Sequence, residues 1–115
     1  MSETRGYAVA YLREVDFDEE IVEYLRRIDE TLDPYGGRFL VHGGTLHPLE
    51  GEWPGDVVIV EFPSVEAAKA WYHSPGYQDI LRLRTDNSHS ITAILEGVPA
   101  GYRAEKGLEK MLAAR

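Results

Sequence analysis

The chain of 115 residues contains no cysteine, which excludes a disulfide framework and any chemistry that depends on a thiolate. Basic residues are also few: 12 Lys and Arg stand against 20 Asp and Glu, giving a net charge of −8. Because the basic side chains are scattered, the positive surface that holds a phosphate backbone is missing, and we expect no nucleic-acid partner. Long apolar runs are absent, so we expect no membrane-spanning segment.

The first residues, Met1 to Arg5, are polar, and no apolar segment follows that could serve as a signal peptide. We therefore expect a cytoplasmic protein. A chain of this length folds around one small core, which buries only about two-thirds of the unfolded surface, so additional burial through self-association would stabilise it. Neither a glycine-rich phosphate loop nor a nucleophile elbow occurs in the sequence.

Alternating strand and helix patterns predict the order β-α-β-β-α-β, which is typical of an α+β, ferredoxin-like fold with a four-stranded antiparallel sheet and helices on one face. We predict this domain over residues 1–98 and a helical extension over residues 99–115. The predicted strands are Gly6–Leu12, Arg38–His42, Val57–Phe62 and Ser90–Glu96. The first predicted helix carries the apolar stripe Ile21, Leu25, Ile28, Leu32 and Tyr35. The other predicted helices follow Ser64 through Tyr72, run from Gly76 to about Leu83, and span Tyr102–Arg115.

Polar residues mark the helix starts. Asp16 and Glu19 have the spacing of a capping box, and Ser64 is a predicted N-cap. Ser74 followed by Pro75 predicts a second start after a break in the helix. The pair Gly43-Gly44 predicts a bulge, or a place where another backbone or a ligand comes close.

Side chains of a strand alternate between the two faces of its sheet, so each predicted strand divides into two sets. One set is wholly apolar and suits packing beneath the helices: Ala8, Ala10, Leu12, Phe39, Val41, Val58, Val60, Phe62, Ile91, Ala93 and Leu95. The other set is mixed: Tyr7, Val9, Tyr11, Arg38, Leu40, His42, Val57, Ile59, Glu61, Ser90, Thr92 and Ile94. A face exposed only to water would not need so many apolar residues, and a fully apolar core would not hold unpaired charges. We therefore predict a homodimer in which two mixed faces enclose a partly polar cavity.

The strings YGGRFLVHGG and EFPSVEAAKAWYHSPGY, with the order of elements around them, resemble the family called domain of unknown function 1330, within the dimeric α/β-barrel superfamily. The resemblance covers roughly Gly6 to Gly97. It implies a ferredoxin-like protomer whose sheet packs against a second copy to form a barrel, and it implies no reaction. Relatives by fold include quinone-forming monooxygenases that need no cofactor, muconolactone isomerase-like enzymes and haem-binding proteins.

Arg38 directly follows Gly36-Gly37 and is predicted to point into the cavity of the dimer. Its guanidinium could hold a ligand carboxylate or enolate through forked hydrogen bonds, or it could pair with Glu61 on the neighbouring strand. His42 is the candidate general acid or base near neutral pH. Alternatively, His42 is a structural residue of the cavity wall, hydrogen-bonded to a carboxylate or carbonyl group. The predicted ligand-binding residues are Arg38, Tyr11, Tyr7, Glu61 and Thr92.

Two functional hypotheses follow. In the first, the protein binds or transforms a small anionic or aromatic molecule in the cavity of the barrel; in the second, it is a non-catalytic dimeric module whose cavity is filled by side chains. Haem or metal binding is disfavoured, because His42 and His47 are an odd number of residues apart and so fall on opposite faces of a regular strand. We expect no cofactor and no metal.

Overall fold

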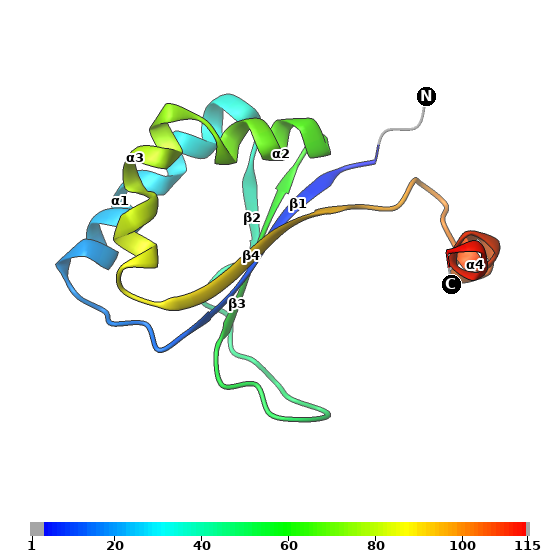
Figure 1. Ribbon diagram of the computed structural model, residues 1–115, viewed down its shortest axis with the longest axis horizontal. Coiled ribbons are helices and arrows are strands. Elements are labelled where there is room, and N and C mark those ends of the chain that lie inside the picture. The colour runs from blue at the N-terminus through cyan, green and yellow to red at the C-terminus, as the bar shows by residue number, and fades with distance from the viewer. Residues whose placement is uncertain (1–3, 115) are drawn as a thin grey trace.

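The computed structural model describes residues 4–114, which form a four-stranded antiparallel sheet with helices on one face (Figure 1). Expectations that rest on Met1, Ser2, Glu3 or Arg115 lie outside the described residues. The strands are β1 (Gly6–Arg13), β2 (Arg38–Val41), β3 (Asp56–Phe62) and β4 (His89–Glu96), and the helices are α1 (Glu19–Leu32), the short 3₁₀ helix η1 (Asp33–Tyr35), α2 (Val65–Tyr72), α3 (Pro75–Thr85) and α4 (Ala104–Ala113).

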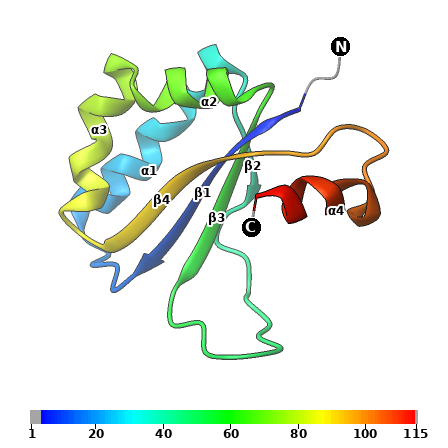
Figure 2. The same cartoon turned by 45° about the vertical axis from the view of Figure 1, so that its right-hand side comes forward.

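The strand order across the sheet is β2-β3-β1-β4, so β1 and β3, which are each followed by a helix, lie in the centre. This order and the alternation of elements confirm the predicted α+β, ferredoxin-like protomer. Helices α1, α2 and α3 all cover the same face of the sheet, and the other face, here called the open face, carries no helix layer (Figures 1 and 2). Within one protomer the sheet does not close into a barrel.

Helix α1 begins at Asp18, whose side chain accepts hydrogen bonds from the backbone N–H groups of Glu20 and Ile21. The predicted cap at Asp16 is therefore wrong by two residues, because three acidic residues precede the helix and only the backbone geometry selects among them. The apolar stripe is largely as predicted, with Tyr24 added: the buried residues are Ile21, Tyr24, Ile28 and Leu32.

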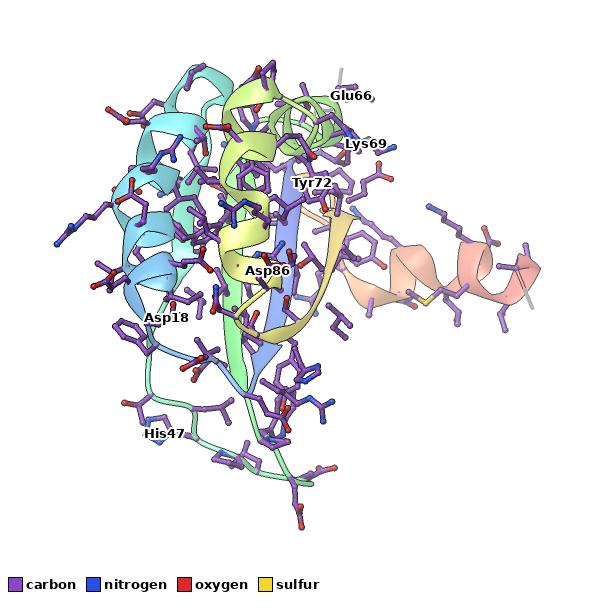
Figure 3. The ribbon with its side chains drawn as sticks, turned by 60° about the vertical axis from the view of Figure 1, so that its left-hand side comes forward. Asp18, His47, Glu66, Lys69, Tyr72 and Asp86 are labelled. Carbon is purple, nitrogen blue, oxygen red and sulfur yellow. The ribbon has the colours of Figure 1, made fainter. Side chains whose placement is uncertain are left out.

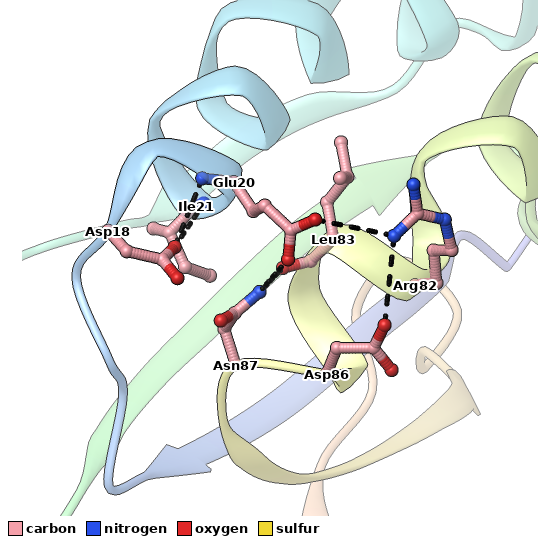
Figure 4. Close-up of polar contacts among 7 residues, drawn as sticks. All are labelled: Asp18, Glu20, Ile21, Arg82, Leu83, Asp86 and Asn87. Atoms are coloured by element: carbon pink, nitrogen blue, oxygen red, sulfur yellow. Dashed lines mark hydrogen bonds and ion pairs between the residues drawn. The ribbon is translucent and has the colours of Figure 1, made fainter.

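The predicted starts of α2 and α3 are confirmed. Ser64 Oγ accepts from the N–H of Ala67 at 3.0 Å, and Ser74 Oγ accepts from the N–H of Tyr77 at 3.2 Å. Side chains then tie the end of α3 to the start of α1: Asn87 donates to Glu20 at 2.9 Å, and Arg82 contacts the same carboxylate at 3.4 Å (Figure 4). These contacts fix how far the two helices stand apart over the sheet.

The core lies between these helices and the sheet, where side chains from both layers interdigitate (Figure 3). Phe62, Leu32, Ile80 and Tyr77 are fully buried there. Trp71 packs against Tyr77 with ring centroids 4.1 Å apart. Burial of such large side chains contributes about 1.5–3 kcal/mol each.

A bulge in β2 overturns part of the predicted division between the faces. Phe39 pairs with Val60 and Val41 pairs with Ile59, so Leu40 is the extra residue. Beyond this point the alternation is inverted: Val41 shares the open face with Ile59, and His42 turns to the helix side. The predicted positions of Val41 and His42 are therefore wrong, and the bulge lies before Gly43-Gly44.

The predicted faces of β4 are also wrong. Ala8 pairs with Ile94 and Ala10 pairs with Thr92, which places Thr92 and Ile94 beneath the helices. Ile91, Ala93 and Leu95 correspondingly lie on the open face. Because β4 is an edge strand with apolar residues at both parities, its alternation alone does not show which set is buried.

Helix α4 stands apart from the sheet and the other helices (Figures 1 and 2). Its apolar residues Leu108, Met111 and Leu112 are exposed. The radius of gyration is 16.0 Å, compared with about 13 Å expected for one compact domain of this length. No helix in the described part of the chain is long and apolar enough to cross a membrane.

Candidate functional site

A partly enclosed hollow lies between α1, α3 and the inner face of the sheet, and is here called the helix-side cavity. Its volume is about 430 Å³. It exists because β1, a central strand, carries small residues on this face, Ala8 and Ala10, where larger side chains would fill the layer. Leu25, Val58 and Trp71 contribute further apolar wall. Other hollows, beside the β2–β3 loop and at the start of α1, are more open to solvent.

Polar groups enter this apolar cavity at a few places: His42, Asp56, Arg84 and Thr92. His42 directly follows β2, and the others come from β3, α3 and β4, so tertiary structure alone brings them together. A cavity with apolar walls and a few convergent polar groups is the usual form of a small-molecule site.

Arg84 is the most deeply placed of these polar groups, with 6% of its surface exposed. It donates from Nη1 to Ser90 Oγ at 2.6 Å and from Nη2 to the Tyr77 hydroxyl at 3.4 Å. Burial lowers the pKa of Arg84, but the adjacent Tyr77 and Tyr24 raise it by more, so the guanidinium stays charged. Within residues 4–114 it forms no ion pair with a carboxylate.

Behind Arg84, the hydroxyl groups of Tyr24 and Tyr77 share a hydrogen bond of 2.7 Å. Burial raises the pKa of Tyr24 far above its ordinary value of 10.0, so this phenol is neutral at physiological pH. The Tyr24 hydroxyl therefore brings no negative charge to this cluster.

His42 lies at the edge of the cavity and is exposed to solvent. Its ring stacks on Phe39, with centroids 4.5 Å apart and 24° between the planes. The stacking holds the imidazole near the cavity, where it could exchange a proton with a ligand.

On the open face, Glu61 forms a second polar cluster. Its carboxylate accepts from Arg38 Nε at 2.9 Å and from the Tyr7 hydroxyl at 3.1 Å, and Arg5 lies 3.9 Å away. The hydrogen bond from Arg38 is the main reason that the pKa of Glu61 falls below its ordinary value. Arg38 is therefore paired with Glu61, which is one of the two roles that the sequence predicts for this arginine.

The predicted site residues therefore divide between two places. Arg38, Glu61, Tyr7 and Tyr11 lie on the open face, and Tyr11 there meets Trp53 edge to face at 6.3 Å. His42 and Thr92 lie on the helix side, so the prediction that they share a face with Arg38 is wrong. The bulge at Leu40 and the pairing of β4 cause this separation.

Sequence reasoning missed Arg84, Tyr24 and Trp71 as residues of the site. Arg82 and Arg84 are charged residues of one short helix, and taken alone such a pair indicates a solvated or ion-paired surface. The spacing Tyr77, Ile80, Arg84 follows the steps of three and four of a buried helical stripe, and this signal could have identified it.

Among residues 4–114, no three histidine, aspartate or glutamate side chains come together as a set of metal ligands.

The sequence profile of a family described as a domain of unknown function, DUF1330, matches residues 5–98. No curated protein sequence matches the chain. Several solved structures share its fold. RPA0582 from Rhodopseudomonas palustris, a protein of unknown function, is 21% identical with a TM-score of 0.58, over 84% of each chain.

A dimeric ferredoxin-like protein of unknown function from Jannaschia sp. CCS1 is 15% identical with a TM-score of 0.61, over 80% of this chain and 98% of that one. SnoaB, a cofactor-independent oxygenase from Streptomyces nogalater, is 14% identical with a TM-score of 0.52, over 90% of this chain and 100% of that one. At these identities the similarity establishes the fold alone.

Proposed function

The chain belongs to the DUF1330 family, whose function is unknown, and we propose that it binds a small molecule in the helix-side cavity. The observation that carries this proposal is an apolar cavity of about 430 Å³ with a charged group buried in its wall. That volume falls within the range of about 300–1,000 Å³ typical of ligand sites.

In this proposal the residues of the cavity wall contact different parts of the ligand. Arg84 holds one end of the ligand, Trp71 and Leu25 pack against its apolar part, and His42 stands at the edge as a proton donor or acceptor. Thr92 offers a hydroxyl on the wall formed by β4. These roles replace the single site around Arg38 that the sequence suggested.

We also propose that the protein is a homodimer through the open face. This face presents apolar side chains to solvent in the single chain, among them Ile91 and Leu95, which are 73% and 53% exposed. An apolar patch of this kind marks an association surface. The neighbour from Jannaschia sp. is dimeric, and the Glu61 cluster would then lie at the interface between the two copies.

The cavity is tested by filling it. Ala10→Leu places a larger side chain inside, whereas Ala70→Leu makes the same change on the exposed surface of α2. A thermal-shift screen with small aromatic acids, phenols and their neutral counterparts, followed by calorimetry, should find compounds that bind the wild type and the Ala70→Leu control. Binding should be lost in Ala10→Leu while its unliganded melting temperature is kept. Unchanged binding to Ala10→Leu would place the ligand elsewhere.

A further inference from the structure

Arg84 is a buried cation without an anion. Its surface is 6% exposed, and its hydrogen-bond partners in the described chain are the side-chain oxygens of Ser90 and Tyr77 rather than a carboxylate. Asp56 contributes to the same cavity wall, but no ion pair joins it to Arg84. Buried charges are normally paired, because removal from water is costly unless an opposite charge compensates it.

The exposed arginine two residues earlier shows the contrast. Arg82 lies on the same helix and contacts two carboxylates, Glu20 at 3.4 Å and Asp86 at 3.7 Å (Figure 4). The chain carries 20 acidic residues, so carboxylates are plentiful. Arg82 is thus paired at the surface, where an ion pair contributes little to stability. Arg84 has no carboxylate partner in the interior, where an unpaired charge is most costly.

The guanidinium also retains capacity for a ligand. It has five N–H donors, and two of them are committed to the bonds with Ser90 and Tyr77. These two bonds orient the planar group, and Arg84 lies in the wall of the cavity, where an acceptor could reach its other donors. A carboxylate or phenolate is the acceptor that a guanidinium binds most strongly.

We propose that the ligand of the helix-side cavity is a small organic anion, a carboxylate or phenolate with an apolar or aromatic body, and that Arg84 is its anchor. This inference rests on the proposed function. The anionic group replaces the missing carboxylate partner of Arg84, and the body of the ligand contacts Trp71, Leu25 and Val58 along the apolar wall.

The alternative is that Arg84 serves only to tie α3 to β4 through Ser90. The two roles differ in their effect on stability. If Arg84 is only a tie, Arg84→Met removes two hydrogen bonds and lowers the melting temperature. If Arg84 is kept for a ligand, replacing an unpaired buried charge by an apolar side chain is neutral or stabilising without ligand. Tyr77 keeps its bond to Tyr24 in either case.

The experiment compares benzoate with benzamide, which have nearly the same shape but differ in charge. Binding of both is measured by calorimetry to the wild type, Arg84→Met, Arg84→Lys and the surface control Arg82→Met, and melting temperatures are recorded without ligand. The wild type and Arg82→Met should prefer benzoate by at least about tenfold. Arg84→Met should abolish this preference and melt at or above the wild-type temperature, and Arg84→Lys should retain part of it.

Each result decides a different point. Equal affinity of the wild type for benzoate and benzamide would overturn the anion assignment and leave the cavity proposal standing. Failure of both compounds to bind the wild type would overturn the two proposals together. A lower melting temperature with an unchanged preference for benzoate in Arg84→Met would make Arg84 a structural tie. If Arg84→Met does not fold, the wild type and Arg84→Lys still give the comparison.

Discussion

Glu61 illustrates how a single residue links the sheet to its surroundings. It is only 8% exposed although it lies on the open face, because Arg38, Tyr7 and Arg5 surround its carboxylate. The hydrogen bond from Arg38 lowers its pKa below the ordinary value of 4.5. A carboxyl group with a lowered pKa in the folded state stabilises that state only while it is ionised.

We therefore predict that Glu61 contributes stability that is fully present above pH 4.5 and is lost as the pH falls through its folded pKa. The melting temperature of the wild type should exceed that of Glu61→Gln at neutral pH, and the difference should shrink below that value. Glu52→Gln, an exposed change in the loop before β3, is the control and should show no such trend. Arg38→Ala should move the loss to higher pH. A difference that does not depend on pH would refute the role of the ion pair.

Gly6 is required for close packing rather than for its backbone freedom. A Cβ atom at this position would meet Ser64 O at 2.5 Å and Val65 Cα at 2.7 Å, both in the backbone at the start of α2. The first strand can approach this helix because position 6 has no side chain.

We predict that Gly6→Ala destabilises the protein by about 1–3 kcal/mol, the usual cost of an added methyl group that backbone atoms cannot avoid. Gly76→Ala is the matched change, since a Cβ atom there meets only Thr31 Cγ2 at 3.9 Å. Because Gly76 lies in α3, alanine should stabilise by up to about 1 kcal/mol. Urea denaturation measures both. Equal effects of the two substitutions would show that packing at Gly6 is not the cause.

At the scale of elements, the start of α1 shows how local chemistry and tertiary contact cooperate. Asp18 caps the helix, and Glu20 in its first turn receives Asn87 and Arg82 from the end of α3. The same few residues therefore end one helix, begin the other and hold them together. Both helices also contribute residues to the wall of the helix-side cavity.

We predict that Asp18→Ala lowers the free energy of unfolding by about 0.5–2 kcal/mol, the usual effect of losing an N-cap. Asp16→Ala, two residues earlier, should change it much less, because the side chain of Asp16 makes no cap bond. Chemical denaturation of the two variants distinguishes them. A larger effect at Asp16 would return the cap to the position that the sequence spacing suggests.

At the scale of the whole molecule, only one of the two faces of the sheet is covered by helices. The inner face is covered by helices from the same chain, whereas the open face is left with exposed apolar side chains from β2 and β4. A stable interface buries about 800 Å² on each partner, and this face, which spans all four strands, is the surface available for it.

We predict that light scattering gives about twice the chain mass for the wild type and the chain mass for Ile91→Lys, because the new charge would be buried in the interface. Ala70→Lys, the same charge on the exposed side of α2, should leave the dimer intact. A wild-type monomer with an intact circular dichroism spectrum would show that the open face is stable without a second copy.

The sequence by itself determined the order of elements, the two capping serines of α2 and α3, and the apolar stripe of α1. These depend on side chains within a few residues of each other, so periodicity and spacing contain the information. The pairing of Arg38 with Glu61 was also accessible as one of two interpretations, since both lie on neighbouring predicted strands. The family resemblance agrees with all of these local patterns.

Only the tertiary structure decided which residues form the candidate site. One extra residue at Leu40 inverts the faces of the end of β2, and the pairing of β4 with β1 turns Thr92 toward the helices. Both depend on hydrogen bonds between strands distant in sequence, which no single-strand pattern specifies. The burial of Arg84 likewise results from the docking of α3 onto the sheet. The cavity is thus a product of register and packing, which together place Arg84 in its wall.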